Sequence, residues 1–240
     1  MSTFEWQART EALLGHIACE KLRCSRAAVF GCGGVGSAAA EGLARSGFGF
    51  LCVIDRDTVS DTNRNRQLLA TAETVGKEKA AVQKERILSI APETDVLALC
   101  EDVTAENIGR IFDLSSPDVV IDCVDTVSAK LAIIAEADRR GIPCLSSMGT
   151  GNKLDPTRFR VDDITKTSVC PLARVMRREL KNRGIAHLRV LWSDEIPTAP
   201  VSAPEAEASG RIPPASAPWV PPVAGLILAG EAARTLISSR

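Results

Sequence analysis

The sequence predicts an α/β protein built on a doubly wound, mainly parallel β-sheet with a C-terminal strand/helix extension. Short apolar runs alternate with segments of helical periodicity over the first 150 residues, and such alternation is typical of parallel strands joined by helical crossovers. A glycine-rich turn follows the first apolar run, and acidic residues follow two later ones. Because ligands of such sheets bind outside the carboxyl ends of the strands, a binding crevice is expected there.

Five short apolar runs are expected to form the central strands. They occupy residues 27–30, 50–54, 96–100, 119–122 and 144–147. Helical periodicity marks the segments before and between them, and Pro92 stops one of these helices. The expected helices are 5–22, 35–45, 77–90, 105–112 and 128–140, and the polar segment 56–74 is expected to be a loop.

The chain changes character after Met148. Its remaining segments are expected to form a strand, an amphipathic helix, an irregular loop and a small apolar helix, at 156–164, 171–183, 196–222 and 223–237. The loop is rich in Pro, Ala and Ser. Pro221 and Pro222 stand at the start of the last helix, where proline is tolerated.

The turn after the first strand reads GCGGVGS from Gly31 to Ser37. Gly31, Gly33 and Gly36 have the G-x-G-x-x-G spacing of a Rossmann-like nucleotide turn, and Gly34 lies between them. The turn needs positive φ and a close backbone approach, and the following helix offers free N–H groups and a partial positive charge to phosphate. The spacing indicates a nucleotide, but not which one or for what reaction.

The composition is that of an ordinary globular protein, with 45% hydrophobic and 25% charged residues. A formal net charge of −1 means that any contact with nucleic acid must come from a local patch. The first 20 residues lack the apolar core of a signal peptide, and no run approaches the roughly 20 apolar residues that span a bilayer. A cytoplasmic protein without membrane contact is therefore expected.

The chain has eight cysteines and no C-x-x-C pair, which argues against a structural zinc site. Cys52, Cys123 and Cys144 lie in apolar strand-like runs, as buried reduced thiols do. Disulfides are the alternative that the even count leaves open. Cys170, which precedes Pro171, is either incidental or a reactive thiol near the substrate.

Residues 55–79 supply more charged and amide side chains than a nicotinamide-binding enzyme needs. Asp55 ends the second strand, where an acidic residue holds ribose hydroxyls, and Asp57 follows it. Asn63 and Arg66 come from the loop, and Lys79 from the start of the next helix. Clustered Arg, Asn and Lys beside a glycine turn suit a triphosphate, whose charge exceeds what one helix N-terminus offsets.

Asp125 follows the fourth strand, in the run IDCVD. It suits Mg²⁺, which prefers a carboxylate together with phosphate oxygens. ATP and magnesium in a crevice whose glycine turn lacks a Walker lysine indicate adenylate transfer, with the α-phosphate as the electrophile. Lys79 and Arg66 would stabilise its charge in the transition state.

The helix expected at 171–183 carries a basic stripe on the face opposite its apolar one. The stripe comprises Arg174, Arg177, Arg178 and Lys181. It lies in a segment, 151–192, that holds ten Lys/Arg against four Asp/Glu. Two interpretations stay open, a solvated helix face and a contact with RNA phosphates.

Four motifs together resemble those of the ThiF-like adenylating enzymes, which activate carboxylates as acyl-adenylates. They are GCGGVGS, DRDTVSDTNRNRQ, VGKEK and IDCVD. The resemblance implies that Asp55 contacts the ribose and that Asp125 holds magnesium. It implies phosphate contacts by Asn63, Arg66 and Lys79. It also implies a homodimer in which Arg9 reaches the triphosphate bound by the neighbouring subunit.

The later half is similar to the tRNA threonylcarbamoyladenosine dehydratases. The similar motifs are SSMGTGNKLDPTRFRVDDITKT, PLARVMRRELKNRGI, WSDE and WVPPVAGLILAG. In that family ATP activates the side-chain carboxylate of the modified adenosine at position 37 of tRNA, and the neighbouring carbamoyl group closes a ring with loss of AMP. The resemblance implies the anticodon arm as the partner of the basic stripe. It implies a single domain, 1–240, with a helical arm, a nucleotide-binding core and a substrate-facing extension at 1–25, 26–150 and 151–240.

Three alternatives remain open. An adenylyltransferase that activates the C-terminus of a ubiquitin-like sulfur carrier fits the first-half motifs, although such enzymes commonly carry paired C-x-x-C zinc ligands. A nicotinamide-binding redox protein would use the glycine turn and Asp55 but leave Asn63, Arg66 and Lys79 idle. A scaffold that binds ATP only to hold its shape is the third. Sulfur-transfer partner proteins, which some relatives have, carry no readable motif here.

Overall fold

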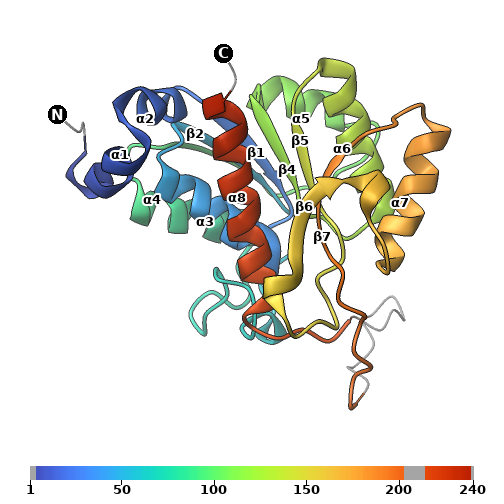
Figure 1. The fold of residues 1–240 in the computed structure, drawn as a ribbon. Coiled ribbons are helices and arrows are strands. Elements are labelled where there is room, and N and C mark those ends of the chain that lie inside the picture. Colours follow the sequence, from blue (N-terminus) through green and yellow to red (C-terminus); the bar gives the residue numbers. More distant parts are fainter. Residues whose placement is uncertain (1–3, 203–213, 239–240) are drawn as a thin grey trace.

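The computed structural model describes residues 4–202 and 214–238. Within these residues the chain forms a seven-stranded sheet in the order β3-β2-β1-β4-β5-β7-β6 (Figure 1). The strands are β1 (Arg26–Phe30), β2 (Phe50–Ile54), β3 (Asp95–Leu99), β4 (Val119–Asp122), β5 (Cys144–Ser147), β6 (Phe159–Asp163) and β7 (Arg189–Ser193). Neighbouring strands are parallel except β6, which pairs antiparallel with β7. The predicted fold class is confirmed.

Helices cover both faces of the sheet. They are α1 (Ala8–Leu14), α2 (His16–Arg23), α3 (Gly34–Ser46), α4 (Lys79–Ile90), α5 (Ile108–Ser115), α6 (Val127–Arg140), α7 (Pro171–Asn182) and α8 (Val220–Ser238). One buried apolar cluster joins α2, α3, α4 and α8 to side chains of the strands, and two others join α5, α6 and α7 to the opposite side. Figure 1 shows the same division, with the sheet between the two groups.

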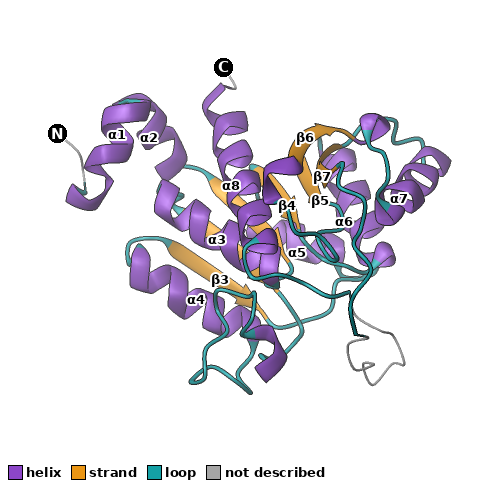
Figure 2. Cartoon of the chain, turned by 60° about the horizontal axis from the view of Figure 1, so that its bottom comes forward, coloured by secondary structure: helices purple, strands orange, loops and turns teal. Residues whose placement is uncertain are grey.

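The side chains of the central strands alternate between these clusters. In β1, Ala27 and Val29 pack toward α3 and α8, whereas Ala28 and Phe30 pack toward α5 and α6. Because both faces are covered, these strands are apolar throughout, as expected for a buried parallel sheet. With both faces covered, the carboxyl ends of the parallel strands are the part of the sheet that helices do not cover. Figure 2 is turned so that the loops at this end come forward.

α3 and α8 pack closely because small residues line their contact. A Cβ atom on Gly225 would lie 2.1 Å from the carbonyl oxygen of Val35, and one on Gly42 would lie 2.7 Å from the Cβ of Ala229. Such distances leave no room for a side chain at either glycine. α8 therefore holds the helix that follows the glycine turn.

α8 is long and apolar enough to cross a membrane by length and composition, with a mean hydropathy of 1.3 over 19 residues. More than half of it is buried within the protein, at 56%. Its acidic residue Glu231 is 5% exposed and pairs with Arg189 and Arg234. Within this structure the helix is a core element that packs on α3 and the sheet.

Several boundaries differ from those expected. The N-terminal helix is two helices, because Gly15 breaks it with φ of 86°. α4 begins at Lys79, so Lys77 lies before it, and α8 begins at Val220 inside the expected loop. The sequence interpretation missed β7, which lies between β5 and β6. Residues 203–213 of the expected loop lie outside the described residues.

Candidate functional site

A cavity of 360 Å³ opens at the carboxyl ends of the strands, between β1 and β4. At this point the strand order changes side, since β2 and β3 lie on one side of β1, and β4 and β5 lie on the other. Open α/β sheets bind ligands at this switch point. The cavity is lined by nine of the predicted nucleotide residues, which are Gly31, Gly33, Gly34, Asp55, Asp57, Asn63, Arg66, Lys79 and Asp125. Residues that are distant in sequence therefore meet at one site.

The glycine turn forms the floor of this cavity. Gly31 has φ of 87°, which favours glycine, and a Cβ there would lie 3.0 Å from the backbone of Cys123. Gly36 does not line the cavity; a Cβ on it would lie 1.7 Å from the Gly31 carbonyl oxygen. Gly36 thus lets the first turn of α3 pack on the glycine turn, which directs free backbone N–H groups toward the cavity.

Asp55 ties the end of β2 to the glycine turn. Its Oδ2 accepts a hydrogen bond from the Cys32 N–H at 2.6 Å, and its Oδ1 accepts one from the Asp57 N–H at 2.8 Å. Burial raises the pKa of Asp55, and the charge of Lys79 and these two bonds offset only part of that effect. Each carboxylate oxygen keeps a further lone pair that a ribose hydroxyl could use.

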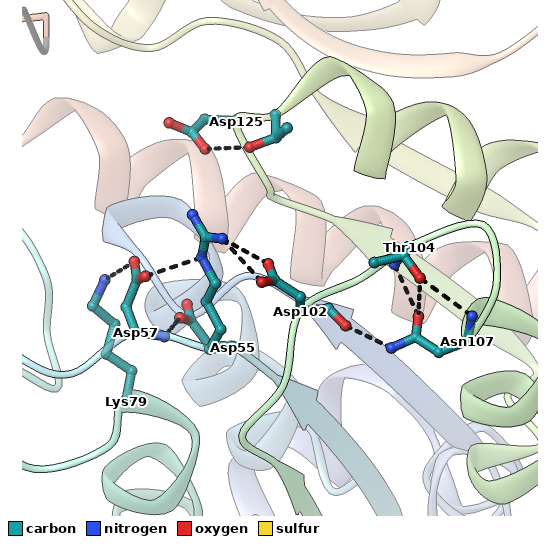
Figure 3. Close-up of polar contacts among 9 residues, drawn as sticks. Asp55, Asp57, Lys79, Asp102, Thr104, Asn107 and Asp125 are labelled. Atoms are coloured by element: carbon teal, nitrogen blue, oxygen red, sulfur yellow. Dashed lines mark hydrogen bonds and ion pairs between the residues drawn. The ribbon is translucent and has the colours of Figure 1, made fainter. Parts of the chain in front are cut away.

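Lys79 and Asp57 form an ion pair at the cavity wall, with Lys79 Nζ 2.9 Å from Asp57 Oδ2 (Figure 3). Lys79 is only 6% exposed. Burial alone would raise the pKa of Asp57, but the hydrogen bonds and charges of Lys79 and then Arg56 together outweigh it and hold the pKa below its ordinary value. The site thus contains a buried ammonium whose present partner is a carboxylate that an anionic ligand could replace.

The loop after β2 brings amide and guanidinium groups to the same wall. Asn63 is buried, and its Oδ1 accepts from the Ser60 N–H at 3.1 Å, so the amide nitrogen is the group able to donate to a ligand. Arg66 donates to the Thr62 carbonyl at 3.1 Å and to Asn65 Oδ1 at 2.8 Å. Burial lowers the pKa of Arg66, an effect that a phosphate would oppose.

Asp125 is exposed on a separate loop, after β4 (Figure 3). Its Oδ1 accepts a weak hydrogen bond from Thr126 Oγ1 at 3.4 Å. Among the described residues no three His, Cys, Asp or Glu side chains gather in a way that could hold a metal ion. An exposed carboxylate at a phosphate cavity fits magnesium that takes its other ligands from phosphate and water.

The remaining predicted residues lie outside this cavity. Arg9 is exposed on α1 and does not line the cavity. On α7, Arg174, Arg178 and Lys181 are exposed. Arg177 is partly buried and donates to the Thr167 carbonyl at 2.9 Å, so the stripe presents three outward charges and a fourth turned inward.

Three further features of the cavity were not foreseen. Gln67 is buried against it, and its Oε1 has no hydrogen-bond partner among the described residues. Arg56 pairs with both oxygens of Asp102, at 2.9 and 3.0 Å, and so joins the β2 loop to the β3 loop. Thr150 and, from the extension, Gly151, Pro214, Ser216 and Pro221 also line the cavity. Gln67 ends the motif DRDTVSDTNRNRQ and could have been found there, whereas nothing in the local spacing predicts the other two.

All eight cysteines are free thiols, which excludes the disulfide alternative for this structure. Cys24 and Cys100 are exposed, unlike the buried thiols expected. Cys170 is 4% exposed at the start of α7, and this burial favours its being incidental rather than reactive. Burial raises the pKa of Cys52 to about 12, and local desolvation together with the hydrogen bond and charge of Glu78 raises the pKa of Cys100 to about 11, so neither is an activated nucleophile.

The strand order and the cavity at its switch point place the molecule in the Rossmann-like class of α/β proteins. The chain belongs to the ThiF family, which it matches over residues 7–239. It is 43% identical, over 96% of its length and 94% of the relative's, to the tRNA threonylcarbamoyladenosine dehydratase of Bacillus subtilis. The predicted family resemblance is confirmed.

Two further similarities bear on the site. The crystal structure of the Escherichia coli tRNA N6-threonylcarbamoyladenosine dehydratase in complex with ATP superposes with a TM-score of 0.88 at 32% identity, covering 99% of this chain and 97% of that one. The sulfur carrier protein ThiS adenylyltransferase of B. subtilis is 38% identical, but over only 55% of this chain and 40% of its own. The similarity to the dehydratases therefore includes the extension, whereas this similarity to a sulfur-carrier enzyme spans about half of the chain.

Proposed function

We propose that this protein is an ATP-dependent tRNA threonylcarbamoyladenosine dehydratase. The observation that carries the proposal is the meeting of the glycine turn, the Lys79–Asp57 pair, Arg66 and Asp125 around one cavity. The near full-length similarity to the B. subtilis and E. coli dehydratases supports it. The reaction would convert threonylcarbamoyladenosine at position 37 of tRNA into its cyclic, dehydrated form.

In the proposed complex, ATP lies along the carboxyl ends of β1, β2 and β4. Its phosphates face the N–H groups at the start of α3, and Asp55 holds the ribose. Lys79, Arg66 and the Asn63 amide contact the triphosphate, and Lys79 exchanges Asp57 for a phosphate oxygen. Gly31, Gly33 and Gly34 form the phosphate-binding turn. Asp57 is the partner of Lys79 when no nucleotide is bound.

The chemistry proceeds in two steps. A carboxylate oxygen of the substrate attacks the α-phosphorus, a new O–P bond forms, and pyrophosphate leaves. The carbamoyl group of the same side chain then attacks the activated carbonyl, a proton is lost and AMP departs. Because ring closure is intramolecular, positioning can supply on the order of 7–11 kcal/mol of the barrier reduction in favourable cases.

Asp125 is the residue that we propose to hold Mg²⁺, together with phosphate oxygens and water. When bound, the ion would neutralise charge that develops on the pyrophosphate leaving group. Lys79 and Arg66 act on the same charge from the other wall of the cavity. The three groups come from different loops, so the geometry of the triphosphate is fixed from two sides.

The extension is proposed to face the tRNA. Its residues 151, 214, 216 and 221 line the cavity that would hold the triphosphate. The exposed charges of α7, Arg174, Arg178 and Lys181, are proposed to contact phosphates of the anticodon arm, and Arg177 to orient the start of that helix. Reversing Arg174 and Lys181 to Glu should weaken tRNA binding and flatten its salt dependence. The same reversal at Lys84, an exposed lysine on α4, is the matched control.

We further propose a cytoplasmic homodimer. Leu13 and Ile17 on the N-terminal helices are each 84% exposed, which is unusual for large apolar side chains near one another. Arg9 lies on the same helix as Leu13. A second copy that covers these residues would bring the Arg9-bearing helix against a neighbouring subunit, as the resemblance implies.

ATP–pyrophosphate exchange tests the reaction class. Exchange that depends on tRNA carrying threonylcarbamoyladenosine is expected, with unmodified tRNA as the matched control. Exchange that requires a ubiquitin-like carrier protein would support the sulfur-carrier alternative. Absence of exchange with either substrate would favour a redox protein or a scaffold.

Nucleoside mass spectrometry of tRNA from a deletion strain tests the product. Loss of the cyclic nucleoside, restored by the wild-type gene but not by a Lys79→Met variant, is expected. Persistence of the cyclic nucleoside in a strain that has no second gene able to make it would refute the proposal.

A further inference from the structure

A buried ion pair lies beneath the loop that carries Asp125. Lys130, in the first turn of α6, and Asp122, the last residue of β4, are both 0% exposed, and Lys130 Nζ lies 2.9 Å from Asp122 Oδ2. Ser146 of β5, also buried, donates from Oγ to the same carboxylate oxygen at 2.6 Å and accepts from Lys130 at 3.3 Å. Three elements thus converge on one oxygen of Asp122.

The other oxygen of Asp122 holds the loop itself. Its Oδ1 accepts a hydrogen bond from the Val124 N–H at 3.2 Å, and the Cys123 N–H donates to the Phe30 carbonyl at 2.8 Å. Residues 123–126 line the cavity, and Cys123 lies directly against the glycine turn at Gly31. The Asp122 carboxylate thus holds the loop at Val124, while the backbone hydrogen bond of Cys123 holds the loop against β1, which leads into the glycine turn.

Packing alone does not account for these charges. Removing two charges from water is costly, and apolar residues of similar volume often hold such a contact equally well. A carboxylate fixed at one oxygen by an ammonium and a hydroxyl, however, presents its second oxygen in one direction. An apolar pair would leave the Val124 N–H without that acceptor.

We propose that Lys130, Asp122 and Ser146 are positioning residues that set the 123–126 loop and with it the carboxylate of Asp125. This inference rests on the proposed function, in which Asp125 holds magnesium. None of the three contacts the nucleotide in that arrangement. Outer groups that orient a metal ligand typically affect metal affinity by about 10–100-fold when removed.

The test compares two double variants that both remove the buried charges. Lys130→Met with Asp122→Asn keeps an oxygen that accepts from the Val124 N–H, whereas Lys130→Met with Asp122→Leu does not. We expect the Mg²⁺ concentration that half-saturates ATP binding to rise about ten-fold in the Leu variant, which loses the acceptor, and about five-fold in the Asn variant, which keeps the acceptor but loses the ammonium that fixes its direction. Binding of a fluorescent ATP analogue without Mg²⁺ should change little in either.

Hydrogen exchange of the Val124 amide gives a readout that needs no ligand. It should be faster in the Leu variant than in the Asn variant, at equal unfolding midpoints. If the double variants fail to fold, Ser146→Ala removes only the hydroxyl and should raise the half-saturating Mg²⁺ concentration by about five-fold. Lys84→Met on α4 is the control for loss of a helical lysine.

The outcomes separate this inference from the proposed function. If wild type binds ATP in a Mg²⁺-dependent manner but the two double variants match it in Mg²⁺ dependence and Val124 exchange, the positioning role is refuted and the proposed function stands. If Asp125→Asn leaves the Mg²⁺ dependence of wild type unchanged, the magnesium site and this inference both fail.

Discussion

Lys79 is held at the cavity by a carboxylate rather than by solvent, since it is 6% exposed and lies 2.9 Å from Asp57. We expect Lys79→Met to lower the rate of ATP–pyrophosphate exchange by about 100-fold or more, as loss of one preorganised donor to transition-state charge does. Lys77→Met, two residues earlier and exposed, is the matched control and should act like wild type. Wild-type exchange in the Lys79 variant would remove this residue from the reaction.

Asp55 predicts a pH dependence of stability. Burial raises the pKa of its carboxyl, so the folded protein holds this proton more tightly than the unfolded chain does. Its stabilising contribution is fully present below its ordinary pKa and is lost as the pH rises through the raised folded pKa. Urea unfolding should show wild type losing stability relative to Asp55→Asn across this window, while the variant binds ATP more weakly at pH 7. Parallel stability curves would contradict the assignment.

The sequence identified those site residues that belong to local motifs. Asp55 follows a strand and Lys79 opens a helix, where position along the chain already indicates the crevice, and Asn63 belongs to the loop motif between them. The Arg56–Asp102 and Lys130–Asp122 pairs were not predicted, because each joins loops or elements whose proximity depends on the folded sheet. Asn63 also proved to have two tasks, since it caps the turn at Ser60 as well as lining the cavity.

At the scale of elements, the contact between α3 and α8 predicts a coupled loss of stability and nucleotide binding. Gly225→Ala would place a methyl group 2.1 Å from the Val35 carbonyl, and overpacking of this kind costs about 1–3 kcal/mol or more. Because Val35 lies in the first turn of α3, ATP affinity should fall as well. Gly230→Ala on the same helix meets nothing within 4 Å and should instead stabilise by about 0.5–1 kcal/mol. Urea unfolding and ATP titration of both variants measure the two effects.

Strand β7 shows where element prediction failed. Val190, Leu191 and Trp192 are apolar and buried, but this run is short and exposed Arg189 precedes it. Its last residue, Trp192, also belongs to the motif WSDE, which was interpreted as a family motif and not as part of a strand. In the sheet β7 lies between β5 and β6, although it follows β6 in the sequence. Local sequence patterns do not indicate between which strands a later strand will pair. By contrast, the strands β1 to β5 were predicted to within a residue or so. For β1, β2 and β4 the reason is that both faces are buried, so their runs are almost continuously apolar.

For the whole molecule, subunit complementation distinguishes a site completed across a dimer from one completed within a chain. We expect Arg9→Ala and Lys79→Met homodimers to be inactive, and the heterodimer of the two, isolated with separate tags, to recover about half of the wild-type exchange rate. One of its two sites would then hold both Lys79 and the partner's Arg9. No recovery would place Arg9 within its own subunit, and an active Arg9→Ala homodimer would place it outside the reaction.

The exposed side chains of Leu13 and Ile17 define the companion control. Changing both to Asp should give a monomer in sedimentation analysis, with nucleotide binding to the cavity of each chain retained. A dimer that persists in this variant would locate the interface elsewhere on the surface.

α8 is the last element of the described chain, yet it buries α3 and contributes Pro221 to the cavity. During translation, β1, the glycine turn and α3 leave the ribosome long before α8 does. Until α8 arrives, the apolar side of α3 stays open to water or to chaperones, and the phosphate-binding turn lacks its support. A nascent chain is therefore unable to assemble this ATP site until α8 has been synthesised and has packed on α3.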